Sequence, residues 1–156
     1  MNVFGEALQP CRVVAEDEAG SWDSRGFCSE MEGGAHQICL KLPGDFSSTT
    51  KQGLWSNSRA DQQHCVCLGA FSNYVSQQTI SPDAVNCKAI PEMALSPALA
   101  KKWKEWNNVS VDKQAEKALE FLRTSCLAQA ESEKEKRYFL EILAKSTDAF
   151  SPGLTS

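Results

Sequence analysis

The chain has 156 residues, a length that suits one domain or one small domain with an extension. Hydrophobic residues make up 42% of it and charged residues 23%, which is ordinary for a folded globular protein. The net charge of −4 argues against a general nucleic-acid-binding protein, because such proteins carry basic surfaces that neutralise phosphates. No apolar run approaches the roughly 20 residues that a membrane-spanning helix needs.

The charge is distributed unevenly along the chain. Residues 1–100 carry 6 basic and 11 acidic side chains, whereas residues 101–156 carry 10 basic and 9 acidic ones. We therefore expect two parts: a cysteine-rich α+β domain over 1–95, and a helical extension over 96–156 that comprises a helix, an αα-hairpin and a tail. No secretory signal or transit peptide is evident at Met1-Asn2-Val3, so we expect a cytosolic chain or one that is already trimmed.

The first part is predicted to hold a short β-sheet and short helices. Glycine and proline recur through residues 1–36, which indicates a loop-rich start. Polar and apolar residues alternate, or apolar residues cluster, in three segments that are predicted to be strands: 37–42, 64–68 and 85–90. We expect a loop with at most one helical turn over 45–62, and a short helix over 71–75.

The second part has the pattern of amphipathic helices. Ser96 is a good N-cap and Pro97 suits the first helical position, so a helix is expected to start there and to end at Asn107-Asn108. Apolar residues at helical spacing predict a second helix over 111–126. Ser132 and Glu135 form a capping box, which predicts the start of a third helix.

Seven cysteines are many for this length: Cys11, Cys28, Cys39, Cys65, Cys67, Cys87 and Cys126. The six in the first part alone allow 15 pairings, so the sequence does not give the connectivity. The odd total argues against a fully bridged secreted scaffold. Buried packing as small hydrophobic residues is the reading we favour for most of them.

The segment His64-Cys65-Val66-Cys67 is the sharpest local cluster. On a strand Cys65 and Cys67 point to the same face, with His64 on the other. Two thiolates on one face are a start for a structural zinc site, which needs four ligands; the others would come from Cys11, Cys28, Cys39 and Cys87. A disulfide or redox role and plain packing are the alternatives.

Catalysis is not expected from the sequence. A nucleophilic cysteine needs a base or positive charge beside it, and the histidines are His36 and His64. Each neighbours a cysteine in the sequence, but this does not aim one side chain at the other. No P-loop, dinucleotide fingerprint or serine nucleophile elbow is present, and no cofactor is expected.

A tryptophan- and lysine-rich helix is the predicted partner-binding segment. Trp103 and Trp106 share a helical face, and tryptophan is enriched at protein interfaces and at membrane–water boundaries. The alternative is that these rings pack the extension onto the first part. The complete set of predicted partner-binding residues is Lys101, Lys102, Trp103, Lys104, Trp106, Phe139, Leu143 and Phe150.

Several short blocks occur in a distinctive order in the first part. The earlier blocks are Asn2-Val3-Phe4-Gly5, Leu8-Gln9-Pro10-Cys11, Gly26-Phe27-Cys28 and His36-Gln37-Ile38-Cys39. The later ones are Phe46-Ser47, Cys65-Val66-Cys67-Leu68 and Val85-Asn86-Cys87-Lys88-Ala89, with Glu92 and Ala94-Leu95. Over residues 2–100 they resemble a family of bacterial, algal and plant proteins called domain of unknown function 2237. The chain departs from it in a shortened stretch over 50–63 and in His64, where the family usually has tryptophan. The family has no established activity to carry over.

These observations favour a non-catalytic accessory or linker subunit that docks on a larger assembly. Its expected partners are protein subunits, with a membrane surface as an alternative and nucleic acid not expected. Because the resemblance extends to algae and plants, a chloroplast photosystem–antenna complex is the most specific prediction. The alternative function is a thiol-redox or zinc-binding protein centred on Cys65 and Cys67, with Cys11, Cys28, Cys39, Cys87 and His64 as further ligands or redox groups.

Overall fold

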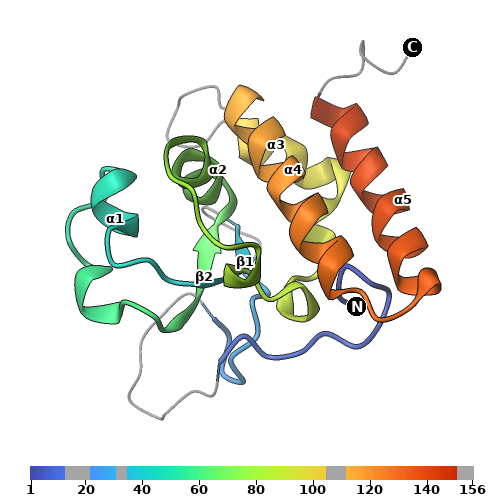
Figure 1. Cartoon of the computed structure of the whole chain (residues 1–156), viewed down its shortest axis with the longest axis horizontal. Helices are drawn as coiled ribbons and strands as arrows, with labels where there is room; N and C mark the ends of the chain where they lie inside the picture. Colours follow the sequence, from blue (N-terminus) through green and yellow to red (C-terminus); the bar gives the residue numbers. More distant parts are fainter. Residues whose placement is uncertain (13–21, 31–34, 105–111, 151–156) are drawn as a thin grey trace.

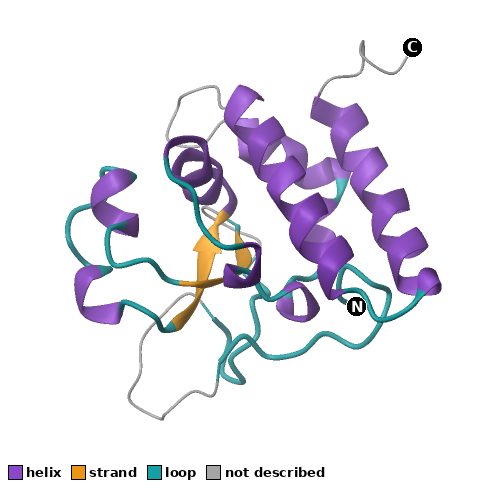
Figure 2. Ribbon diagram, viewed as in Figure 1, coloured by secondary structure: helices purple, strands orange, loops and turns teal. Residues whose placement is uncertain are grey.

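The computed structural model describes residues 1–12, 22–30, 35–104 and 112–150 (Figure 1). Within them the chain forms five α-helices, several short 3-10 helices and a two-stranded sheet, which confirms the small α+β fold. The longer helices gather on one side of the sheet, and a small helical and loop region lies on the other (Figure 2).

The sheet pairs β1 (His36–Lys41) with β2 (Gln63–Cys67) in antiparallel register. Cys39 lies opposite Cys65, and His36 lies opposite Cys67. The register shifts between His36 and Ile38, so Gln37 is an extra, bulged residue on β1. Both strands were predicted to within one residue at each end.

The third expected strand, over 85–90, is wrong. Val85 makes only an isolated bridge with Leu40, and the chain then turns into a 3-10 helix, η3 (Cys87–Ala89). Val85, Cys87 and Ala89 are all buried, so the predicted alternation of buried side chains is correct, whereas the predicted extended backbone is wrong. Two features favour the turn: the backbone N–H of Ala89 donates to the carbonyl of Asn86, and proline at 91 follows closely.

Short elements connect the sheet to the helices. α1 (Phe46–Thr49) and η1 (Asn57–Arg59) occupy the segment between the strands. α2 (Leu68–Gln77) begins directly after β2 and is longer than predicted. The remaining connections are η2 (Pro82–Ala84) and η4 (Glu92–Leu95).

Three helices form the second part: α3 (Pro97–Lys104), α4 (Asp112–Gln129) and α5 (Glu133–Phe150). α4 and α5 run side by side as the expected hairpin (Figure 1). The predicted cap at Ser132 is confirmed, because its Oγ accepts a hydrogen bond from the N–H of Glu135 at 3.2 Å. Pro97 starts α3 as expected, but the buried Oγ of Ser96 has no hydrogen-bond partner within the described part of the chain, so its side chain does not cap the helix.

One hydrophobic core runs through both parts. It includes Val3 and Phe4 at the N-terminus, Phe71 on α2, and Phe139 on α5. Trp103 on α3 is completely buried in it. The predicted boundary near residue 95 therefore marks a change in the type of element, while the packing continues across it. None of the helices in the described residues is long and apolar enough to span a membrane.

Candidate functional site

Six of the seven cysteines form disulfides: Cys11–Cys39, Cys28–Cys65 and Cys87–Cys126. The favoured interpretation, plain packing of reduced cysteines, is thereby corrected. Cys67 is the cysteine outside these bridges, and it is buried. The pair singled out in the sequence is thus chemically unequal, since Cys65 is bonded to Cys28 while Cys67 keeps its thiol.

A pocket of about 400 Å³ opens at the end of the sheet, between the α1–η1 segment and the start of α2. Its wall includes Cys67 and both histidines of the chain. The other side chains that matter for its chemistry are Phe46, Gln52, Trp55 and Arg59. Cys65 and Val66 also line the pocket, so all four residues of the predicted cluster His64-Cys65-Val66-Cys67 lie in its wall.

Cys67 is the N-cap of α2. Its sulfur accepts a hydrogen bond from the backbone N–H of Ala70 at 3.3 Å, and 7% of the residue is exposed. The N-terminus of a helix carries partial positive charge and unpaired N–H groups. Both the hydrogen bond and the helix dipole therefore favour negative charge on this sulfur.

His36 lies opposite Cys67 in the sheet register and in the wall of the same pocket. Its Nδ1 contacts the Oε2 of Glu30 at 2.8 Å, and the same carboxylate oxygen accepts the backbone N–H of His36 at 2.9 Å. Both side chains are 34% exposed. A carboxylate on Nδ1 fixes the ring and leaves Nε2 for proton transfer.

His64 is the deeply buried histidine of the pocket, with 5% of its surface exposed. Its ring lies between those of Trp22 and Trp55, each with a centroid 5.1 Å away. Burial, and then the positive charges of Arg59 and Arg12, lower the pKa of His64 to about 4. It is therefore neutral at pH 7, and its buried Nδ1 has no hydrogen-bond partner among the residues that the structure describes.

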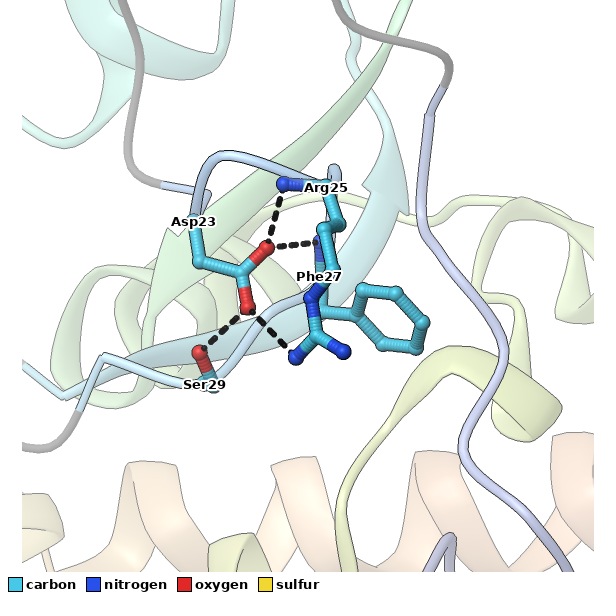
Figure 3. Close-up of polar contacts among 4 residues, drawn as sticks. All are labelled: Asp23, Arg25, Phe27 and Ser29. Carbon is cyan, nitrogen blue, oxygen red and sulfur yellow. Dashed lines mark hydrogen bonds and ion pairs between the residues drawn. The ribbon is translucent and has the colours of Figure 1, made fainter.

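Asp23 organises a tight turn with Arg25, Phe27 and Ser29 (Figure 3), in the segment whose sequence also contains Trp22 and Cys28. Oδ1 of Asp23 accepts hydrogen bonds from the backbone N–H groups of Arg25 and Phe27 at 2.8 and 3.1 Å, and Oδ2 accepts one from Ser29 Oγ at 3.2 Å. Burial raises the pKa of Asp23, but these hydrogen bonds outweigh it and leave the pKa below its usual value. The ionised carboxylate thus anchors the turn.

Sequence reasoning missed several residues of the site: Trp55 and Arg59 in the pocket wall, and Trp22 and Glu30, which contact the wall residues His64 and His36. These four residues come from loops and from η1, so no strand or helix periodicity marks them. Only the two tryptophans gave a signal, because a tryptophan side chain is highly buried on average and is expected to pack against other groups.

The predicted partner-binding residues fall into three groups. Trp103, Phe139 and Leu143 are buried inside the chain, which favours the packing alternative for these side chains, and Lys102 is half-buried. Trp106 lies outside the described residues. For Lys101, Lys104 and Phe150 the structure describes the helical backbone but not the side chains.

Comparison of the chain with protein-family models, with curated proteins and with solved structures finds no match. The resemblance to domain of unknown function 2237 therefore stays a prediction.

Proposed function

We propose that this chain is a thiol-dependent protein that binds a small disulfide-containing molecule in the pocket and reacts with it through Cys67. The observation that carries the proposal is the position of Cys67: a thiol outside the three disulfides, at the N-terminus of α2, in the pocket wall and opposite the His36–Glu30 pair. A thiolate activated by a base that a third group orients is the arrangement that nucleophilic cysteines use.

The reaction is a thiol–disulfide exchange. His36 takes the proton of Cys67, and the thiolate attacks one sulfur of the bound disulfide. A new bond forms between Cys67 and that sulfur, the original S–S bond breaks, and the other half leaves as a thiolate. Electrons balance without a further oxidant, because the bound disulfide is reduced as Cys67 is oxidised.

The pocket wall favours a ligand with a carboxylate. Arg59 supplies a positive charge, and the neutral His64 supplies an unsatisfied nitrogen. Among the described residues that line the pocket none is acidic. Phe46 and Trp55 add aromatic surface for the apolar part of the ligand. Glutathione disulfide has this chemistry and is the probe we choose.

The test is the intact mass of the full chain after incubation with glutathione disulfide. We expect one adduct on Cys67, removed by a dithiol and absent from Cys67→Ser. Serine is the matched control, since its Oγ replaces sulfur as the N-cap of α2 and keeps the helix start. Glu30→Gln should slow the adduct by at least about tenfold, because His36 loses its orienting charge.

Two outcomes would overturn this proposal. One is modification of Cys67 no faster than that of an unstructured cysteine peptide. The other is an equal rate for Arg59→Met and the wild type with glutathione disulfide. An uncharged disulfide serves as the control for Arg59, because its reaction should not depend on that residue.

A second candidate is the accessory subunit of a larger assembly, with a chloroplast photosystem–antenna complex as the specific case. The observation that favours it is an apolar groove of about 200 Å³ between η4 and α5. Met93, Leu95 and Ile142 line it, flanked by the charged Glu92 and Lys145. Met93 is 43% exposed and adds its apolar side chain to the surface of the groove.

The subunit proposal is tested by the size of the protein purified from its source. The wild type should elute in a large complex, and Met93→Glu should release it as a 17.1 kDa monomer. Leu54→Glu is the control, because Leu54 is 68% exposed and lies outside the groove. A wild-type chain that elutes as a free monomer would contradict the proposal.

A further inference from the structure

Two of the disulfides meet in the core beside the sheet. The sulfurs of Cys11, Cys28 and Cys39 all lie within 4.8 Å of one another, and Cys28 is bonded to Cys65. Three sulfurs therefore lie close together, and the fourth, that of Cys65, adjoins them through its bond to Cys28, although the residues span positions 11 to 65 of the chain. All four are buried.

The fold explains why these sulfurs converge. Cys39 and Cys65 are directly opposite each other on β1 and β2, so their side chains leave the same face of the sheet. Cys11 and Cys28 reach that face from the N-terminal segment. The backbone N–H of Cys11 donates to the carbonyl of Gly26 at 2.8 Å, which joins the stretches that carry them.

We propose that, when these two disulfides are reduced, the four cysteines bind one zinc ion. Structural zinc sites are tetrahedral, and with Zn–S bonds of about 2.3 Å the sulfurs stand about 3.8 Å apart. Once the two S–S bonds are broken, the sulfurs of each bonded pair can move apart to this distance, while the sulfurs of Cys11, Cys28 and Cys39 already lie within 4.8 Å of one another. The zinc ion then replaces the two disulfides as the cross-link between the N-terminal segment and the sheet.

The zinc centre would carry negative charge, and a positively charged side chain, that of Arg12, lies near it. Four thiolates and one Zn²⁺ carry a net charge of −2. Arg12 follows Cys11, and its Nη1 lies 3.4 Å from the carbonyl oxygen of Gln63, the residue opposite Lys41 at the start of β2. The Oε1 of the same glutamine lies 3.4 Å from the sulfur of Cys39. The guanidinium is therefore close to the cluster.

The conversion of the two disulfides into four zinc-bound thiolates balances when a dithiol is the reductant. Each dithiol reduces one disulfide and becomes a cyclic disulfide, so two dithiols deliver the four electrons. The four thiols formed release up to four protons as Zn²⁺ binds. In a reducing compartment the zinc form is favoured, and in an oxidising compartment the disulfide form is favoured.

This ligand set differs from the one predicted from the sequence. Cys87 is bonded to Cys126 on α4, and Cys67 lines the pocket described above. Among the described residues, the group of ligand atoms close enough for a metal contains Cys11, Cys28 and Cys39, and Cys65 is bonded to one of them, whereas Cys67 and Cys87 are neither in the group nor bonded to a member of it. The predicted zinc ligands Cys67, Cys87 and His64 are thus left out.

The test uses the full chain and Co²⁺ as a spectroscopic substitute for Zn²⁺. After reduction with a dithiol and removal of the reductant under argon, Co²⁺ should give the absorption of a tetrahedral thiolate site at one equivalent per chain. Zn²⁺ should abolish this signal by displacement, and the oxidised chain should give none. A reduced wild-type chain that binds no metal overturns the proposal, whether it stays folded or not.

Variants identify the ligands. Cys39→Ser should lose the tetrahedral thiolate spectrum. The matched controls are Cys67→Ser and the double variant Cys87→Ser/Cys126→Ser, both of which should keep it. Circular dichroism reports whether each reduced variant folds on adding Zn²⁺. An unchanged spectrum in Cys39→Ser, or its loss in Cys67→Ser, would contradict the ligand set. Cys67→Ser also separates this proposal from the disulfide exchange at Cys67.

Discussion

Gly5 adopts a backbone conformation that side chains disfavour, and it lies against an aromatic ring. Its φ is 75°, and a Cβ added there would come within 2.9 Å of the ring of Tyr138 on α5. Gly53 has a φ of 89°, but no atom of the described residues lies within 4 Å of an added Cβ. Both glycines therefore have a positive φ, but of the two it is Gly5 that has a side chain, Tyr138, close to the added Cβ.

Gly5→Ala is therefore expected to destabilise the protein more than Gly53→Ala. The positive φ costs each variant about 1–2 kcal/mol, and the clash with Tyr138 adds to this only at position 5. The measurement is the free energy of unfolding of both variants in urea. Equal losses would show that Tyr138 moves aside without cost.

His64 makes stability depend on pH. Its pKa is about 4 in the folded protein, against 6.5 for an ordinary histidine. Between these pH values the unfolded chain binds the proton and the folded protein does not. Stability should therefore fall as the pH is lowered from 6.5 toward 4, by up to about 1.4 kcal/mol per pH unit, and His64 should contribute no slope above that window.

The check is urea unfolding across this window for the wild type and His64→Phe. Phenylalanine keeps an aromatic ring between Trp22 and Trp55 and removes the titration. We expect a shallower slope in the variant. The same slope in both proteins would show that other groups, and not His64, bind the protons on unfolding.

At the scale of elements, the periodic segments were predictable and the turns were not. The helix after Ser132 and the strand at 37–42 follow directly from capping and alternation. The segment 85–90 alternates equally well but folds as a 3-10 turn, because Cys87 is bonded to α4 instead of facing a third strand. The pocket residue Trp55, and Glu30 beside the pocket residue His36, come from loops, where only tertiary contacts fix the position.

Helix α3 depends on Trp103 for its attachment. The ring is completely buried against Phe71, with centroids 6.4 Å apart, and its Nε1 donates to the carbonyl of Ala94 at 3.3 Å. Trp103→Ala should lower the free energy of unfolding by about 3–5 kcal/mol. Leu140→Ala is the control, since Leu140 is 36% exposed and its loss should cost less than about 1 kcal/mol. A Trp103→Ala variant of wild-type stability would restore the docking interpretation for this side chain.

At the scale of the whole molecule, α4 is fastened to the first part at one place by several interactions. Cys126 is bonded to Cys87, and the side chain of Gln129 accepts from the N–H of Cys87 at 2.9 Å and donates to the carbonyl of Val85 at 2.8 Å. Lys88 and Glu131 form an ion pair beside them. Together with the shared core, these contacts make the helices an integral part of the fold.

The two parts should therefore unfold together even without the covalent link. The disulfide closes a loop with a sequence separation of 39 residues, and for such a loop the entropy model gives a stabilisation of about 4 kcal/mol. Cys87→Ala/Cys126→Ala should lose up to that amount yet still unfold in a single transition, because the core and Gln129 remain. The measurement is urea unfolding followed by tryptophan fluorescence and by circular dichroism. With Trp103 and Trp106 replaced by phenylalanine, Trp22 and Trp55 report on the first part, and circular dichroism reports mainly on the long helices of the second. Two separate transitions in the variant would contradict the shared core and would show that residues 96–156 are a domain of their own.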